Sequence, residues 1–186
     1  MTPVLIGLVV LVIVIGLWFT IMYNGLIRLR NIVQESWKQI DVELHRRYDL
    51  IPNLVETVKG YASHERGTFE AVTQARAAAS TPGSTPAEQA QQENMLTGAL
   101  RQLFAVAEAY PDLKANQNFL ELQQQLTQTE DRIAAGRRFY NANVRAFNTK
   151  IQSVPSNIVA NLFHFTEAEY FEVDDPEIRS APKVQF

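Results

Sequence analysis

Residues 26–51, LIRLRNIVQESWKQIDVELHRRYDLI, determine the fold class of this 186-residue chain. Apolar side chains recur there at steps of three and four residues, which is the spacing of one face of an α-helix. The same spacing resumes after Pro52 and again from residue 119, where it approaches a heptad repeat over about four repeats. The sequence therefore predicts long packed helices. The positions that carry the pattern are Leu26, Leu29, Val33, Trp37, Ile40, Leu44, Tyr48, Ile51, Leu54, Val55, Val58, Ala62, Phe69, Val72, Phe119, Leu122, Leu126, Thr129, Ile133, Gly136, Tyr140, Val144, Phe147 and Ile151.

Three breaks divide this pattern. Residues 80–86, STPGSTP, predict a loop that ends in a helix start, because proline is favoured in the first helical turn. A second break follows Tyr110, and a third, residues 153–157, precedes a short apolar helix near residues 158–163. Pro52 either kinks one long helix that continues toward residue 80 or starts a new helix, and we favour the kink.

No run of alternating apolar and polar residues predicts a strand before residue 165. The expected fold is therefore all-α, an antiparallel helix bundle over residues 26–165. We expect residues 166–186 to form an acidic, mostly irregular tail that packs on the bundle through Tyr170, Phe171 and Phe186.

The segment before the bundle predicts a transmembrane anchor at residues 1–25. Residues 4–23 carry no charge, and a 20-residue helix spans about 30 Å, the hydrocarbon thickness of a bilayer. Trp18 and Tyr23 lie toward one end, where aromatic rings prefer the headgroup level. A cleavable signal peptide is the competing interpretation, but it needs a basic start and a shorter apolar stretch.

The charges beside this segment predict its orientation. Arg28, Arg30 and Lys38 follow the segment, whereas no lysine or arginine precedes it. The positive-inside rule then places the N-terminus outside the cell and the helical domain in the cytoplasm. We expect Trp18, Tyr23, Arg28 and Arg30 at the membrane surface, where the two arginines act as topology signals or contact anionic lipids.

Composition excludes several classes of function. The chain has 17 basic and 20 acidic residues and a net charge of −3, which is not the basic surface of a nucleic-acid-binding domain. It has no cysteine, which excludes disulfides, iron–sulfur clusters and thiol nucleophiles. We therefore expect no nucleic-acid partner and no cofactor.

Motifs for catalysis are also missing from the sequence. His64 and Glu65 begin like a zinc-protease motif, but Thr68 stands where the second histidine is needed. No nucleophile elbow or glycine-rich phosphate loop occurs. We expect a protein that is not an enzyme, with a metal-dependent hydrolase using His64 and Glu65 as a remote alternative.

Residues 45–53, HRRYDLIPN, place two arginines and an aspartate beside the proline break. Asp49 follows Arg46 by three residues, a same-face spacing, and a break frees backbone carbonyls that arginine can satisfy. A solvated face, a buried network that fixes the register of the bundle, and a partner-binding patch all remain open. The candidate contact residues are Arg46, Arg47, Asp49, Asn53, Arg137 and Arg138, the last two placed opposite by antiparallel packing.

Several motifs together resemble the LemA family. In the first half they are residues 29–31, Trp37, residues 40–42, 46–55 and 57–61, and His64-Glu65. In the second half they are residues 113–116, Phe119, residues 122–123, 129–130, 137–141 and 147–148. The run RRYDLIPNLV at residues 46–55 is specific, and the resemblance covers residues 24–165. The loop at residues 80–86 and the acidic tail are particular to this chain.

The resemblance implies a bacterial inner-membrane protein with an N-terminal anchor and an antiparallel cytoplasmic helix bundle. It implies no reaction and supplies no catalytic residues, and a related branch occurs among proteins of magnetosome membranes. We therefore expect a membrane-anchored scaffold or assembly protein that forms homo-oligomers. The alternative is an accessory or regulatory subunit of another membrane protein, such as a protease or a signalling kinase.

Overall fold

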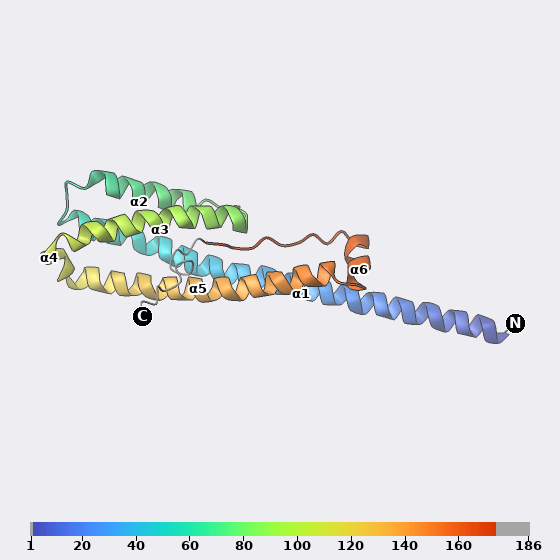
Figure 1. Ribbon diagram of the computed structural model, residues 1–186. Helices are drawn as coiled ribbons and strands as arrows, with labels where there is room; N and C mark the ends of the chain where they lie inside the picture. Colours follow the sequence, from blue (N-terminus) through green and yellow to red (C-terminus); the bar gives the residue numbers. More distant parts are fainter. Residues whose placement is uncertain (1, 174–186) are drawn as a thin grey trace, which may run out of the picture. The chain divides into compact units, whose positions relative to one another are not determined.

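The computed structural model describes residues 2–173, and every regular element within them is a helix (Figure 1). This confirms the all-α fold. The elements are α1 (Thr2–Lys59), α2 (Arg66–Ala79), α3 (Pro86–Glu108), α4 (Pro111–Lys114), α5 (Gln117–Gln152) and α6 (Ser156–Leu162).

The chain forms two compact units, and the long helices α1 and α5 contribute to both. Among the described residues, the first unit contains residues 2–40 and 136–169, and the second contains residues 41–135 and 170–173.

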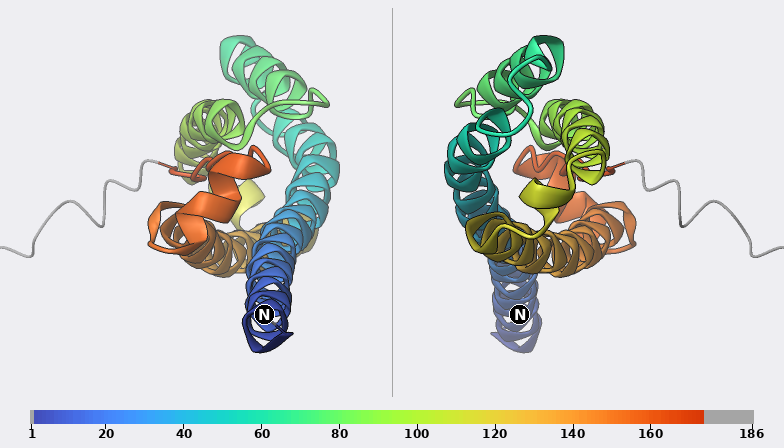
Figure 2. Two further views of the ribbon diagram at one scale, coloured as in Figure 1. Left: turned by 90° about the vertical axis from the view of Figure 1, so that its right-hand side faces the viewer. Right: turned by 90° about the vertical axis from the view of Figure 1, so that its left-hand side faces the viewer.

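In the second unit, α2, α3 and the adjoining parts of α1 and α5 run antiparallel to one another in chain order (Figures 1 and 2). Each helix turns its apolar positions inward, which removes large aliphatic and aromatic side chains from water. The buried side chains include Leu44, Ile51, Leu54, Phe69, Val72, Leu96, Leu103, Leu113, Phe119 and Leu126.

The loop between α2 and α3 follows the sequence prediction. Gly83 has a φ of 88°, a left-handed conformation that glycine adopts without steric cost. Thr85 Oγ1 accepts a hydrogen bond from the Glu88 amide at 3.3 Å, and Glu88 Oε2 accepts one from the Thr85 amide at 2.9 Å. This capping box, with Pro86 in the first turn, fixes the start of α3.

Helix α1 passes through Pro52 without interruption, so the prediction of a helix that continues beyond this proline is confirmed. Its expected extension toward residue 80 is wrong, because α1 ends at Lys59 and α2 begins at Arg66. The helix ends beside Gly60, a residue with low helix propensity.

In the first unit, residues 26–40 of α1 pack against residues 136–152 of α5 (Figure 1). Gly136 allows a close approach here, because a Cβ at this position would lie 3.1 Å from Ile40 Cγ1. Trp37 contacts the ring of Tyr140 at a centroid distance of 5.3 Å. The heptad-like spacing of α5 is thus used to pack against α1.

The segment after α6 has neither helix nor strand over residues 165–173, and the rest of the tail expected at residues 166–186 lies outside the described residues. It returns along α5, where Asn148 exchanges two 2.9 Å hydrogen bonds with the backbone of Ala168, and Tyr140 donates one to the Glu169 carbonyl. Phe171 is fully buried and Tyr170 half-buried, which fits the expected packing of the tail, whereas Phe186 lies outside the described residues.

The N-terminal part of α1 is apolar and exposed. It is the one helix among the described residues that is long and apolar enough to cross a membrane, and none of its most apolar stretch is buried in the protein. The helix therefore fits a membrane anchor, as predicted for residues 1–25.

Candidate functional site

Arg47 of the HRRYDLIPN motif lies in the interior of the second unit, only 2% exposed. Its Nη1 donates to Glu93 Oε2 at 2.6 Å and its Nη2 donates to Thr97 Oγ1 at 2.9 Å, both on α3. Its Nε lies 2.8 Å from Glu130 Oε1 on α5, an ion pair that is not aligned as a hydrogen bond. One arginine thus joins α1, α3 and α5.

Glu93 is the acceptor at the centre of this arrangement. Besides the bond from Arg47, its carboxylate accepts hydrogen bonds from the Tyr48 hydroxyl and from Gln89 Nε2, the latter at 3.1 Å. Gln89 also donates to the Tyr48 hydroxyl at 2.9 Å and to the Ala79 carbonyl at 2.8 Å. We call Arg47, Tyr48, Gln89, Glu93, Thr97 and Glu130 the buried polar cluster.

At Pro52, an arginine from another helix supplies the hydrogen bond that the proline cannot donate. Pro52 has no amide hydrogen, so the Tyr48 carbonyl, four residues earlier, lacks its usual helix partner. Arg76 Nε from α2 donates to this carbonyl at 2.7 Å. An arginine was expected to bond to a freed carbonyl here, but the donor is Arg76 rather than Arg46 or Arg47.

Burial and charge shift two pKa values in the cluster. Burial, together with the nearby Glu93 carboxylate, holds the pKa of Tyr48 well above its ordinary value. The phenol therefore stays protonated and donates to Glu93. Burial also raises the pKa of Glu130, an effect that Arg47 opposes and Glu93 reinforces.

The opposite face of α1 in this unit is open to solvent. Val42, Arg46, Asp49 and Asn53 are all exposed and follow one another at steps of four, three and four residues, so they share one face. We call these four residues the exposed stripe. Arg46 donates to Glu43 at 2.9 Å rather than to Asp49, in the acid-before-base order that favours helix pairs.

The structure therefore divides the predicted patch on α1. Arg47 is buried and unavailable to a partner, because its guanidinium already donates hydrogen bonds to Glu93 and Thr97. Arg46, Asp49 and Asn53 keep the exposure that a contact requires. Arg137 is half-buried and Arg138 exposed, but both belong to the first unit, so their place opposite the α1 residues stays a prediction.

The four residues predicted at the membrane surface all lie on α1 in the first unit. Trp18 and Tyr23 are half-buried, and Tyr23 contacts the rings of Phe163 and Phe165 at centroid distances of 4.7 and 5.8 Å. Arg28 and Arg30 are exposed, and the Arg30 guanidinium lies 5.4 Å from the centre of the Phe165 ring.

His64 and Glu65 lie between α1 and α2, with His64 exposed and Glu65 half-buried. Within residues 2–173, no group of three or more His, Cys, Asp and Glu side chains could hold a metal ion. The described part of the chain thus offers nothing that would complete a zinc site at these two residues.

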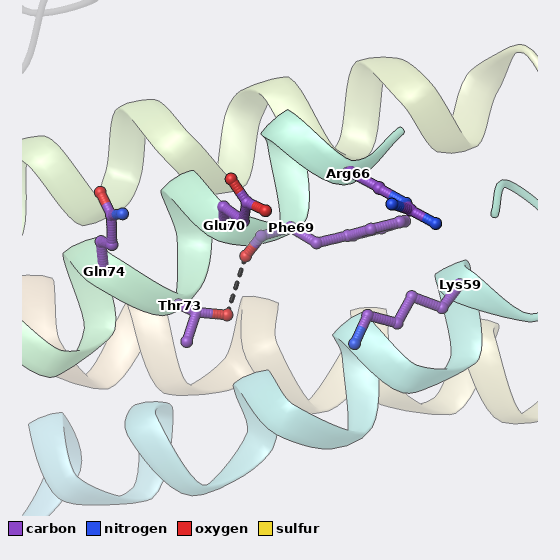
Figure 3. A pocket seen from close by; sticks show the side chains of 6 residues that line it. All are labelled: Lys59, Arg66, Phe69, Glu70, Thr73 and Gln74. Atoms are coloured by element: carbon purple, nitrogen blue, oxygen red, sulfur yellow. Dashed lines mark hydrogen bonds between the residues drawn. The ribbon is translucent and has the colours of Figure 1, made fainter. Parts of the chain in front are cut away.

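A shallow cleft of about 460 Å³ lies at the surface between the end of α1 and α2 (Figure 3). Figure 3 shows the Phe69 side chain between those of Arg66 and Lys59, with Glu70, Thr73 and Gln74 along α2. Lys59 lies 5.9 Å from the centre of the Phe69 ring and also pairs with Glu56 at 3.2 Å. The cleft combines an apolar floor with exposed charges, and its lining contains no nucleophile paired with a base.

The partners of Arg47 were missed in the sequence, although α3 contains a signal for them. Gln89 and Glu93 continue the buried positions Leu96, Leu100 and Leu103 at steps of four and three residues. A carboxylate at such a position needs a partner with opposite charge, because an isolated buried charge is strongly unfavourable.

Comparison with known proteins gives the family. Residues 36–186 match the model of the LemA family. The chain is 31% identical to the protein LemA of Metamycoplasma hominis over 168 residues, 84% of this chain and 75% of that protein.

Two magnetosome proteins of Paramagnetospirillum magneticum, MamQ 1 and MamQ 2, are each 27% identical to this chain over 175 residues. These matches cover 81% of this chain and 64% of each relative. The family match extends over most of the chain and includes both the buried polar cluster and the exposed stripe, so this chain belongs to the LemA family.

Proposed function

We propose that this LemA-family protein is a membrane-anchored helical scaffold that self-associates and has no catalytic activity of its own. The observation that carries the proposal is the division of α1 in the second unit. On its inner face, Arg47 and Tyr48 bond to Glu93 among buried apolar side chains, and its outer face presents the exposed stripe.

The composition of the stripe suits contact between two identical copies. A twofold interface brings the same surface of each subunit together, so a patch with both charges can complement itself. Arg46 and Asp49 supply the two charges, and Val42, 59% exposed, supplies an apolar contact. In two copies related by a twofold axis along the membrane normal, each residue lies at the same height as its counterpart in the other copy. Arg46 of one copy would then pair with Asp49 of the other, which lies about one helical turn away along the axis.

The anchor makes weak contacts of this kind effective. Confinement to one membrane raises the local concentration of the helical domains, so a contact too weak to hold in solution can assemble them. Arg28 and Arg30 favour a cytoplasmic location for these domains. Protease added outside intact cells should then leave the helical domain uncut, whereas cleavage there would contradict this orientation.

Single-cysteine crosslinking tests the interface, because the native chain has no cysteine. In native membranes, Val42→Cys should form disulfide-linked dimers on mild oxidation. Arg101→Cys, at an exposed position of α3, is the matched control and should crosslink weakly.

Charge reversal then tests the pairing. In the Val42→Cys background, Arg46→Glu and Asp49→Arg should each reduce crosslinking, and the two together should restore it. An equal yield of crosslinked dimer at positions 42 and 101, or a yield that neither charge reversal changes, would reject the stripe as the self-association surface.

A further inference from the structure

The stretch around α6, residues 151–163, carries no charged side chain: its sequence is IQSVPSNIVANLF. Within α6 itself the buried residues are Ser156, Val159 and Ala160, which form its inner face. Ser156 Oγ donates to the carbonyls of Lys150 and Ser153 at 2.6 and 2.9 Å, which ties the start of α6 to the end of α5.

The outer face is apolar and exposed. Val154, Ile158, Leu162 and Phe163 are between 50% and 79% exposed. Ile158 and Leu162 lie four residues apart on α6, and Val154 and Phe163 lie just before and just after this helix. We call these four residues the apolar cap. Contiguous exposed apolar surface of this kind is typical of a site that contacts a protein or a membrane.

Contacts with α1 place Phe163, one end of the apolar cap, beside the end of the charge-free stretch. Phe163 packs on Tyr23, the last residue of the charge-free stretch 4–23, at a centroid distance of 4.7 Å. Phe165 lies under the guanidinium of Arg30, farther along α1. Because Arg30 is about 10 Å beyond Tyr23 at 1.5 Å per helical residue, the chain moves from the end of the apolar segment toward its charged flank between Phe163 and Phe165.

The order of residues matches the layers of a membrane surface. The apolar ring of Phe163 lies at the level of Tyr23, and the first charged groups follow later in the sequence on both α1 and the segment after α6. At this depth a bilayer changes from acyl chains to headgroups, a region that favours short apolar elements and aromatic rings.

We propose that the apolar cap inserts into the interfacial layer of the lipid bilayer, as a second membrane contact beside the N-terminal anchor. The occupant is lipid rather than a protein partner, because the cap is continuous with the membrane-facing end of the anchor and has no charged residue to select a partner. This inference rests on the membrane anchor of the proposed function. The first unit is then held to the membrane at two places, which limits its rotation about α1.

The full-length chain in phosphatidylcholine vesicles provides the test, because it has no cysteine of its own. Single cysteines replace residues of comparable exposure, in the variants Ile158→Cys and Leu162→Cys in the cap, Phe139→Cys on α5 and Val12→Cys in the anchor. Each carries an environment-sensitive fluorophore, and the vesicles contain lipids with a nitroxide quencher either near the headgroup or deep in the acyl chain.

We expect the shallow quencher to reduce the emission at positions 158 and 162 several-fold more than at position 139, and the deep quencher to act most strongly at position 12. Phe139 is the matched control, because it is 55% exposed and Ile158 is 54% exposed in the same unit.

Three results would overturn the inference. Quenching at position 12 without quenching at 158 and 162 would reject the cap and leave the anchor intact. A blue-shifted but unquenched label in the cap would indicate that a second copy of the chain covers it instead of lipid. Absence of quenching at position 12 would reject the anchor itself and with it the proposed function.

Discussion

The two faces of α1 in the second unit carry the same residue type in opposite environments. Arg47 is enclosed by α3 and α5 and bonds to Glu93 and Thr97, whereas the neighbouring Arg46 is exposed and bonds to Glu43 on its own helix. Side chains one residue apart point about 100° apart around a helix, so sequence proximity says little about shared function. The difference teaches that this motif combines a structural residue with surface residues.

The largest effect should come from breaking the buried pair. Arg47→Ala leaves the Glu93 carboxylate buried without its arginine, and we expect it to reduce the free energy of unfolding by about 3–5 kcal/mol. Denaturant unfolding of the full chain in detergent micelles, followed by circular dichroism, measures this. Arg46→Ala is the matched control and should cost under about 1 kcal/mol. Equal losses of stability for the two substitutions would contradict the distinction between a structural Arg47 and a surface Arg46.

Alkaline pH should lower the free energy of unfolding through two buried tyrosine hydroxyl groups. Burial, with the charge of Glu169, raises the pKa of Tyr140 to about 12, and burial raises that of Tyr48 as well. Above a pH of about 10 the tyrosines of the unfolded chain lose their protons, whereas those of the folded chain still keep them. The free energy of unfolding is therefore highest below that pH and falls as the pH rises. For Tyr140 the loss amounts to about 2–3 kcal/mol by about pH 12.

Tyr140→Phe isolates this effect, because it removes the ionisable group and keeps the ring. The variant should lose less stability than the native chain between neutral and alkaline pH, measured by the same unfolding transition. An identical alkaline decline in both proteins would show that Tyr140 does not contribute to it.

The hydrogen bond from Arg76 to the Tyr48 carbonyl should contribute less to the free energy of unfolding than the Arg47–Glu93 ion pair. Arg76→Ala leaves the Tyr48 carbonyl without its donor, and we expect a loss of about 1–3 kcal/mol. Pro52→Ala restores a helix amide that can bond to the same carbonyl. The cost of Arg76→Ala should therefore shrink in the Pro52→Ala background, and an unchanged cost in this double-mutant cycle would contradict the proposed role of Arg76.

The smallest effect is expected in the exposed stripe. Asp49 is exposed, and Arg46 bonds to Glu43 instead, so Asp49→Ala should change the free energy of unfolding by less than about 1 kcal/mol. A loss above this value in thermal or denaturant unfolding would indicate that Asp49 is part of the buried network. The same substitution should nevertheless weaken the crosslinking through Val42→Cys.

Much of the fold could be predicted from local patterns. The steps of three and four residues predicted the buried faces of α1 and α5, and Thr85 and Pro86 lie where the sequence predicted a helix start. The path of α1 beyond Pro52 was harder to predict, because continuation through a proline depends on a distant donor, Arg76. Its end at Lys59 coincides with Gly60, and one residue of weak helix propensity is a poor predictor of where a long helix ends.

The site could be predicted only in part, because local spacing does not show which residues meet across the bundle. Arg47 bonds to Glu93, which lies 46 residues later in the sequence, and no local motif connects the two. The network was one of the open interpretations of the HRRYDLIPN motif, but its carboxylate was expected at Asp49. A search for acidic residues at core positions of the other helices would have identified Glu93.

For the full-length protein in native membrane particles, extracted without detergent, self-association predicts a particle made of this chain alone, with a protein mass that is a multiple of 21.1 kDa. Arg46→Glu should shift the distribution toward the single chain. A native particle that holds one copy of the chain would contradict self-association, and a fixed ratio with a second polypeptide would favour an accessory subunit instead.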